Sequence, residues 1–354
     1  MREPSPTSPK RRARLLRLVA AAAVLSAVAG YLAVQYVTGG SGGPGCRVVS
    51  GRGGGAAYVF SPEQAVNAAT IAAVGTNREL PERAVTIALA TALQESGLRN
   101  LDHGDRDSLG LFQQRPSQGW GTRGQIMDPT YAAGMFYEHL VKVPGYTRLP
   151  LTVAAQRVQR SGFPEAYAKH EPDAALLAAA LTGRSAATLT CEGRPGPNRT
   201  AGPDAVRAAL VRDFGRGALE EAGAQVHAGS PTAAPAPSGT AGASGRTVTV
   251  PVPERADGSA ARPRQERGWQ LAHWAVANSS ALHIERVRYA GREWVAGGTD
   301  SRWRTVRTQA REAEGTADGK GGAGQADGSE GTGPDGSGPA PGGDADAVRI
   351  TTGQ

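Results

Sequence analysis

A run of apolar residues near the beginning of this 354-residue chain constrains its fold more than any other feature. Residues 18–37 carry no charged side chain, and a helix of that length can cross a bilayer. A basic cluster precedes the run: Lys10, Arg11, Arg12, Arg14 and Arg17. The positive-inside rule therefore predicts a cytoplasmic segment at residues 1–17, a single anchor in the cell membrane at residues 18–37, and a mostly extracellular chain. The alternative is a cleaved signal peptide, but the run is longer than usual and no clear cleavage motif follows it.

The remainder of the chain alternates between apolar regions and segments that are rich in glycine and proline. The chain holds 49 glycines and 24 prolines, and because they are clustered they predict linkers instead of one large core. We expect a Gly-rich linker at 38–56, a folded domain at 57–227, a second linker at 228–245, a small module at 246–308 and a disordered tail at 309–354.

The first folded region has the signals of an all-helical domain. Ser61-Pro62, Pro81-Glu82 and Asp128-Pro129 each combine residues that favour the first turn of a helix. An apolar band follows Glu82, and Gly97 supplies a helix stop. Further helices are expected at residues 152–159, 164–169, 172–181 and 203–214. The predicted fold class is therefore mainly α.

The module at 246–308 mixes both kinds of structure. Residues 247–252 alternate like a short strand, and residues 268–282 fit a helix. Residues 284–289 form a second expected strand, which residues 292–295 could pair with. This pattern predicts a small α/β module.

Charge and cysteine content narrow the possible partners. Much of the net charge of +7 comes from the basic N-terminus, and no nucleic-acid-binding motif is present. A basic extracellular chain would suit an anionic cell wall. Cys46 and Cys191 form an even pair that predicts a disulfide outside the cytoplasm. The two cysteines and six scattered histidines make no metal-binding pattern, and no cofactor is expected.

Glu95 is the strongest candidate for chemistry. It lies in the last turn of the expected apolar helix, where the negative end of the helix dipole disfavours a carboxylate. Apolar neighbours such as Leu98 add desolvation in the same direction. Both effects raise the pKa of Glu95, as a general acid near neutral pH requires.

A second motif follows after a short polar loop. Ser108, Gly110, Leu111 and Gln113 belong to a Ser-x-Gly-Leu-x-Gln pattern. Glycine allows a close backbone approach, and the amide of Gln113 can hydrogen-bond a sugar hydroxyl or N-acetyl group.

Together, Glu95-Ser96-Gly97 and the Ser-x-Gly-Leu-x-Gln pattern resemble those of the lysozyme-like soluble lytic transglycosylases. Residues 103–122, 126–129 and 158–171 look like a membrane-anchored actinobacterial branch of that superfamily, and the resemblance covers about half of the chain. It implies a goose-type lysozyme-like helical domain that acts on peptidoglycan glycan strands. Glu95 would be the catalytic acid, and the implied substrate-binding residues are Ser108, Gly110, Gln113, Gln114, Trp120, Gln159 and Tyr167. Trp120 could instead close a loop over the core, and Tyr167 could be a core residue.

By this resemblance, Glu95 would protonate the oxygen that joins N-acetylmuramic acid to N-acetylglucosamine, and then help to close a 1,6-anhydro ring. That path needs one carboxylate, whereas hydrolysis needs two. Asp102, Asp105 and Asp107 lie between the two motifs, and Asp107 is the preferred second carboxylate. Alternatively, these acids only form turns.

The chain departs from the family at its third motif, usually a Tyr-Asn-Ala-Gly-like segment. The matching residues are Val158-Gln159-Arg160-Ser161, followed by Phe163 and Tyr167. This departure keeps open a different class of function, a non-catalytic lysozyme-fold protein that binds peptidoglycan as a wall-assembly scaffold. The module at 246–308 resembles a small C-terminal domain of some actinobacterial cell-wall proteins, which implies an accessory wall-binding or interaction unit.

Overall fold

A computed structural model describes eight ranges of the chain: residues 45–51, 55–160, 164–193, 202–215, 245–252, 263–297, 302–306 and 346–353. They all belong to one compact unit, Pro44–Gln354. The predicted anchor at 18–37 and nearly all of the predicted linker at 228–245 lie outside these ranges. Within them, no helix combines the length and the apolar character needed to cross a membrane.

The helical part of the unit follows the proline and glycine signals of the sequence. Ser61 caps the first helix, its hydroxyl accepting from Gln64 N while the Gln64 side chain accepts from Ser61 N. The helices of this part are α2 (Pro62–Asn77), α3 (Glu82–Ser96), α4 (Arg123–Ile126), α5 (Pro129–Leu140), α6 (Leu151–Gln159), the 3-10 helix η2 (Pro164–His170), α7 (Glu171–Leu181) and α8 (Pro203–Phe214).

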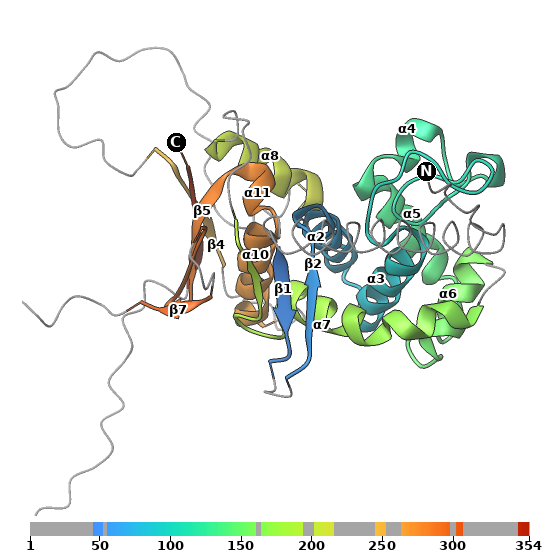
Figure 1. Ribbon diagram of the computed structural model, residues 1–354, viewed down its shortest axis with the longest axis horizontal. Helices are drawn as coiled ribbons and strands as arrows, with labels where there is room; N and C mark the ends of the chain where they lie inside the picture. The colour runs from blue at the N-terminus through green and yellow to red at the C-terminus, as the bar shows by residue number, and fades with distance from the viewer. Residues whose placement is uncertain are drawn as a thin grey trace, which may run out of the picture. The chain divides into compact units, whose positions relative to one another are not determined.

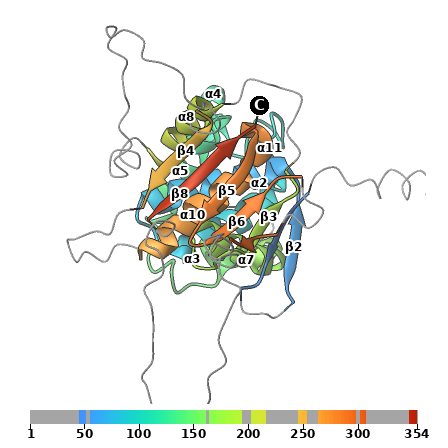
Figure 2. The ribbon, with the colours of Figure 1, turned by 90° about the vertical axis from the view of Figure 1, so that its left-hand side faces the viewer.

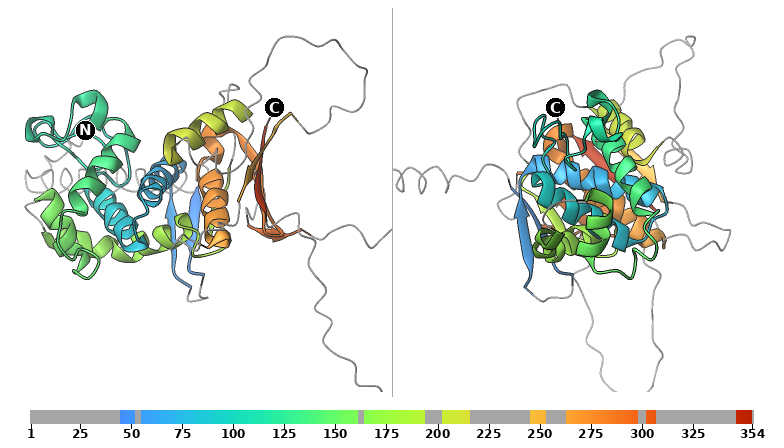
Figure 3. Two further views of the ribbon diagram at one scale, coloured as in Figure 1. Left: turned by 180° about the vertical axis from the view of Figure 1, so that it is seen from behind. Right: turned by 90° about the vertical axis from the view of Figure 1, so that its right-hand side faces the viewer.

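Helix α3 is the centre of this part. It packs against α2, α5, α6, η2 and α7 (Figures 1 and 3). Its buried residues include many alanines, whose small side chains allow close approach: Ala84, Ala88, Ala90 and Ala92. Because α3 is held on several sides, its C-terminal end has a fixed position.

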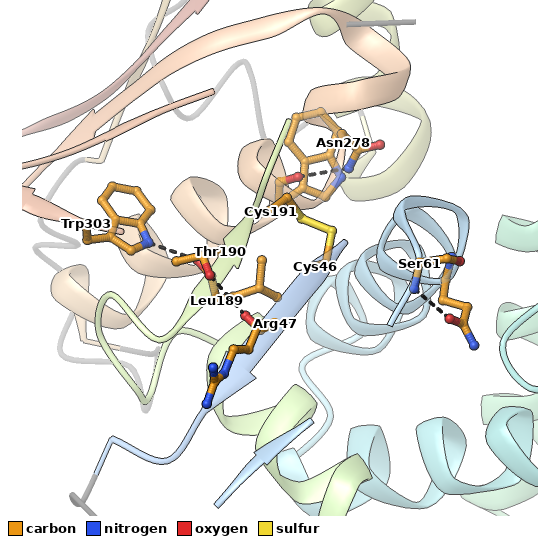
Figure 4. The surroundings of a disulfide bond; sticks show 10 residues. Cys46, Arg47, Ser61, Leu189, Thr190, Cys191, Asn278 and Trp303 are labelled. Atoms are coloured by element: carbon orange, nitrogen blue, oxygen red, sulfur yellow. Dashed lines mark hydrogen bonds between the residues drawn. A yellow bond between two sulfur atoms is a disulfide. The ribbon is translucent and has the colours of Figure 1, made fainter. Parts of the chain in front are cut away.

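A small antiparallel sheet joins two distant parts of the chain. It contains β1 (Cys46–Val49), β2 (Ala57–Phe60) and β3 (Leu189–Cys191) in the order β2-β1-β3. Cys46 lies directly opposite Cys191 in the β1–β3 register, and the two form a disulfide with an S–S distance of 2.02 Å (Figure 4). The predicted disulfide is therefore confirmed.

The remaining described residues form a second antiparallel sheet and the helices beside it. The strands are β4 (Thr247–Pro251), β5 (Ile284–Tyr289), β6 (Arg292–Val295), β7 (Arg304–Thr305) and β8 (Ala347–Thr352), in the order β4-β8-β5-β6-β7 (Figure 2). Helices α10 (Arg264–Ala277) and α11 (Ser279–Leu282) lie between β4 and β5 in the sequence.

Helix α10 packs against the five-stranded sheet and also against α2, α7 and β3 (Figure 1). Trp274 Nε1 donates to the buried carboxylate of Asp213 in α8 at 2.8 Å. His273 Nδ1 lies 2.8 Å from the Ala180 carbonyl, and its Nε2 accepts from Thr188 N. Burial lowers the pKa of His273 to about 4, so its ring is neutral at neutral pH. Buried polar contacts thus bind this part of the chain to the helical part.

The overall class is mixed α/β, about half helical with two antiparallel sheets, whereas the sequence predicted a mainly α fold with one small α/β module. Two predicted segments need correction. Cys46–Val49, placed in the linker at 38–56, is the central strand β1, because Val48 and Cys46 point into the core. Ala347–Thr352, placed in the disordered tail at 309–354, is the internal strand β8, with Val348 and Ile350 fully buried.

Candidate active site

Glu95 lies in the last turn of α3, and the end of that helix is closely defined. Gly97 adopts the left-handed conformation with φ of 62°, and its N–H donates to Leu93 O at 3.1 Å. The bond from Gly97 is that of an αL-type helix end, and the N–H of Leu98 donates to Ala92 O at 3.1 Å. Two side chains of α2 then bind the same turn, because Gln64 donates to Gly97 O and Asn67 to Leu98 O, each at 2.8 Å. The half-buried Glu95 side chain therefore projects from a rigid position.

Two other elements supply partners for the Glu95 carboxyl group. The hydroxyl of Tyr167, in η2, donates to Glu95 Oε1 at 2.6 Å, and its ring is fully buried. Gln159, the last residue of α6, also hydrogen-bonds Glu95. The same amide donates from Nε2 to Phe112 O at 2.7 Å. Glu95, Tyr167 and Gln159 thus form one cluster, which we call the Glu95 group.

Burial is the largest influence on the pKa of Glu95 and raises it above the ordinary value. The hydrogen bonds from Tyr167 and Gln159 lower it and offset part of this effect. Desolvation thus acts on the pKa of Glu95 in the direction that the sequence predicted. Such a group holds a proton to a higher pH than an ordinary glutamate does, and two donors stabilise the carboxylate once the proton has left. This combination suits a general acid that later acts as a base.

The Ser-x-Gly-Leu-x-Gln motif forms a tight loop that is tied to the end of α3. Gly110 N donates to Leu101 O at 2.7 Å, and Leu109 and Gln114 exchange two backbone bonds of 2.9 Å. Ser96 Oγ donates to Leu111 O at 2.8 Å, which links the two predicted motifs directly. The Glu-Ser-Gly motif and the Ser-x-Gly-Leu-x-Gln motif are thus joined in one local structure.

Gly110 is required by this loop. Its φ is 76°, and a Cβ atom there would lie 2.8 Å from Ile126 O. The close backbone approach that the sequence predicted for Gly110 is therefore made to the protein's own chain.

Several residues predicted to bind substrate contact the protein's own backbone. Gln113 Nε2 lies 3.3 Å from both His103 O and Gly110 O. Gln114 is 1% exposed, and its Nε2 donates to Ala132 O at 3.0 Å. Ser108 is also buried, and its N–H donates to Asp105 O. The side chains of Gln113 and Gln114 therefore bind backbone carbonyl groups of the protein.

Trp120 likewise packs inward. Its side chain is buried against His139 of α5, with ring centroids 4.2 Å apart. Of the two roles considered for Trp120, this packing matches closure of a loop over the core.

Asp107 is engaged at a different point of the loop. It accepts from Arg115 Nε at 2.8 Å and from Ser117 N at 2.8 Å, at the start of the 3-10 helix η1 (Pro116–Gln118). Arg115, followed by Ser117, holds the pKa of Asp107 well below its usual range. Asp102 pairs with His103 in an exposed position, and this contact lowers the pKa of Asp102. Within the described residues, none of the contacts of these two acids is made to the Glu95 group.

Two contacts near Glu95 were not predicted from the sequence. The first is the hydrogen bond from the Tyr167 hydroxyl to the Glu95 carboxyl group. Tyr167 is both a core residue and a partner of Glu95, because a buried tyrosine needs an acceptor for its hydroxyl. The second is made by His170, whose Nε2 lies 3.2 Å from Oε1 of Gln94, the residue before Glu95. Desolvation lowers the pKa of His170. Ser161 and Phe163 of the third motif lie outside the described residues.

Among the described residues, no three His, Cys, Asp or Glu side chains gather in a way that could hold a metal ion. A scan of the sequence against protein-family models finds no match. A search of curated proteins also finds none.

Proposed function

We propose that this chain cleaves the glycan strands of peptidoglycan, as a lytic transglycosylase with a lysozyme-like helical part. The observation that carries the proposal is the Glu95 group. A half-buried carboxyl group with a raised pKa lies at a rigid helix end, and a tyrosine and a glutamine from two other elements hold it. The resemblance of the two motifs to the lytic transglycosylases supplies the substrate class.

In the proposed reaction, the Glu95 carboxylic acid donates its proton to the oxygen between N-acetylmuramic acid and N-acetylglucosamine. The bond from the anomeric carbon to that oxygen breaks, and the N-acetylglucosamine end leaves as an alcohol. The 6-hydroxyl of the muramic acid then bonds to the anomeric carbon, and the Glu95 carboxylate accepts the hydroxyl proton. The product is a 1,6-anhydro sugar, and Glu95 is protonated again.

The contacts of Glu95 support both proton transfers of the proposed reaction. Burial favours the protonated form of Glu95 before cleavage, while Tyr167 and Gln159 stabilise the carboxylate between the two proton transfers. Asp107 is occupied by Arg115 and Ser117, which favours the route that needs one carboxylate over hydrolysis with two.

An extracellular location follows from the same proposal. The Cys46–Cys191 disulfide is typical of proteins outside the reducing cytoplasm. The basic segment and apolar run at the beginning of the sequence would hold the protein at the cell membrane, close to newly made wall strands.

One observation favours the second candidate, a non-catalytic scaffold that binds peptidoglycan. The amides of Gln113 and Gln114 and the ring of Trp120 contact the protein's own atoms, which leaves fewer of the expected sugar contacts. The two candidates differ in whether glycan bonds are broken.

The test is digestion of purified peptidoglycan by the full chain in a non-ionic detergent. Wild type should release soluble fragments with 1,6-anhydro ends, which mass spectrometry distinguishes from reducing ends. Glu95→Gln should reduce the rate by about 10²–10⁴-fold. Glu165→Gln, at an exposed position two residues from Tyr167, is the matched control and should keep full activity.

Release of no fragments by wild type, with binding to peptidoglycan retained, would replace the proposal with the scaffold. Equal rates for wild type and Glu95→Gln would remove Glu95 from the mechanism. Reducing ends in place of anhydro ends would make the enzyme a muramidase.

A further inference from the structure

The backbone just after Glu95 contains two consecutive residues in the left-handed conformation, which we call the left-handed turn. Gly97 has a φ of 62° and Leu98 a φ of 60°. Glycine adopts this conformation without strain, whereas in leucine the Cβ atom makes it unfavourable. Strained backbone of this kind persists only where surrounding groups fix it, and it is concentrated at functional sites. The Leu98 side chain is fully buried, so the core supplies part of that support.

Helix α2, which packs against α3, supplies the rest of the support with two amide side chains (Figures 1 and 3). Asn67 Nδ2 donates to Leu98 O at 2.8 Å. Gln64 Nε2 donates to Gly97 O, also at 2.8 Å. The carbonyl group of each residue of the left-handed turn is therefore held by its own donor, and both donors belong to the same helix.

Asn67 is an unfavourable residue for its place in α2. It is 6% exposed, and the neighbouring Ala68, Ala69 and Ile71 are buried as well. Asparagine has a low helix propensity, and burial of an amide costs free energy unless the amide is hydrogen-bonded. Sequence choices that break a local stability rule occur mainly where a protein uses them. What the Asn67 side chain gains in return is its bond to the left-handed turn.

Gln64 joins the beginning of α2 to the end of α3. Its Oε1 accepts from Ser61 N at 2.7 Å in the capping box of α2, while its Nε2 binds Gly97 O. The two contacts use different atoms of one amide, so they can be separated. A glutamate at this position would keep the acceptor for Ser61 N and lose the donor to Gly97 O.

The geometry of Glu95 depends on the left-handed turn, because only Ser96 lies between them. The Tyr167 hydroxyl lies 2.6 Å from Glu95 Oε1. A displacement of about 1 Å would take these two atoms beyond hydrogen-bonding distance. Misplacements of that size can lower a reaction rate by about 10²-fold.

We propose that Asn67 and Gln64 are positioning residues for glycan cleavage, which hold the left-handed turn and through it the Glu95 carboxyl group. The inference rests on the proposed function and extends it to α2, a helix that contributes no residue to the Glu95 group. Both amides act through the backbone of the turn.

Thr70 provides a matched control in the same helix. It is also buried, and its hydroxyl donates to the Asp213 carboxylate of α8 at 3.3 Å. Thr70 therefore makes a buried polar contact from α2 to an element other than α3. Asn67→Leu and Thr70→Val each replace a buried polar side chain with an apolar one of similar size.

The first measurement is the rate of peptidoglycan digestion by the full chain in a non-ionic detergent. Asn67→Leu should lower the rate by about 10–10²-fold. Thr70→Val should keep the wild-type rate. Gln64→Glu should also lower the rate and yet unfold at the wild-type temperature, because the capping box is kept and an acid suits the first turn of a helix. This variant decides the question if Asn67→Leu does not fold.

The second measurement is the pH–activity profile of Asn67→Leu. A loosened turn admits water to Glu95, and burial is the largest influence on the pKa of Glu95. That pKa should therefore fall toward its ordinary value, which moves the alkaline limb of the profile to lower pH. Thr70→Val should keep the wild-type limb, because a loss of stability alone leaves the surroundings of Glu95 unchanged.

The groups that face this end of α3 allow such a reading. Tyr167 of η2 and Gln159 of α6 bond the Glu95 carboxyl group, and the amides of α2 are neutral. His170 of η2 lies against Gln94, and desolvation lowers its pKa, so its ring is neutral at neutral pH. Among the described residues, no charged group of α5 or α7 contributes to the shift in the pKa of Glu95.

The third measurement does not require activity. The N–H groups of Gly97 and Leu98 donate to carbonyl groups of α3, so they exchange with solvent only when the turn opens. Hydrogen–deuterium exchange at these two amides should be up to about tenfold faster in Asn67→Leu, which corresponds to the loss of one hydrogen bond. Thr70→Val should exchange at the wild-type rate.

Equal rates and equal alkaline limbs for Asn67→Leu and Thr70→Val would overturn the inference and make Asn67 a structural residue only. Unchanged exchange in Asn67→Leu would overturn it as well, as would full activity of Gln64→Glu. These results differ from failure of the proposed function, which appears as release of no fragments by wild type and would remove the reaction together with its positioning residues.

Discussion

Replacing Cys46 and Cys191 with alanine should lower the free energy of unfolding by about 5 kcal/mol. The disulfide joins residues 145 positions apart, and the chain-entropy relation for such a loop gives about 17 cal/mol/K, or about 5 kcal/mol at 25 °C. The two residues are directly opposite in the β1–β3 register, so alanine leaves the backbone pairing possible. The loss is large against the 5–15 kcal/mol that is typical of folded domains.

The assay is urea unfolding of the full chain, followed by the fluorescence of the buried tryptophans and extrapolated to zero urea. Wild type with a reducing agent should unfold at nearly the same urea concentration as the double variant, and the reducing agent should not affect the variant. Thr190→Ala is the control, because this residue lies beside Cys191 on an exposed part of the strand and should change stability by less than about 1 kcal/mol. A difference between oxidised and reduced wild type below about 1 kcal/mol would refute the loop-entropy argument.

Four further predictions concern the site, its loop and the buried His273. Tyr167→Phe removes a donor to the Glu95 carboxylate, which raises the pKa of Glu95 and should move the alkaline limb of the pH–activity profile to higher pH; a limb that moves to lower pH would contradict the assigned contact. Because burial raises the pKa of Glu95, the fold should lose stability as the pH rises through that pKa. Glu95→Gln should therefore be more stable than wild type at neutral pH and lose this advantage in acid. Urea unfolding at each pH measures the difference in stability. Burial lowers the pKa of His273 to about 4, so stability should be complete above about pH 6.5 and fall by on the order of 3 kcal/mol toward pH 4, a dependence that His273→Gln should remove. Gly110→Ala should destabilise the fold more than Gly119→Ala does, by at least about 1 kcal/mol. Both positions have positive φ, but of the two only Gly110 would bring a Cβ against a carbonyl oxygen. Equal losses of stability in urea would show that the backbone strain of positive φ alone matters.

The helices could be predicted because their signals are local. Ser61, Pro62 and Gly97 act through the first or last turn of a helix, and the observed ends of α2 and α3 lie close to the expected ones. The sequence also placed Glu95 correctly at a buried helix end, since the apolar band and Gly97 are both neighbours in the chain.

What escaped prediction depends on pairing between distant residues. Cys46–Val49 and Ala347–Thr352 are short and lie in Gly-rich surroundings, so nothing local distinguished them from linkers. Cys46–Val49 becomes a central strand only because the distant Leu189–Cys191 pairs with it in addition to Ala57–Phe60. Ala347–Thr352 pairs with Thr247–Pro251 and Ile284–Tyr289, both far away in the sequence. Likewise, the Tyr167–Glu95 bond joins residues 72 positions apart, and no spacing rule announces such a contact.

The position of β8 inside the sheet has a consequence for the order in which the protein is completed. Strand β8 lies between β4 and β5 and pairs with both. These two strands therefore become part of one sheet only after β8, the last described strand, has been synthesised. A chain cut short before Ala347 would expose unpaired strand edges and lose the buried Val348 and Ile350. Such edges invite aggregation and proteolysis. The stability of the five-stranded sheet therefore depends on the segment that is made last among the described strands.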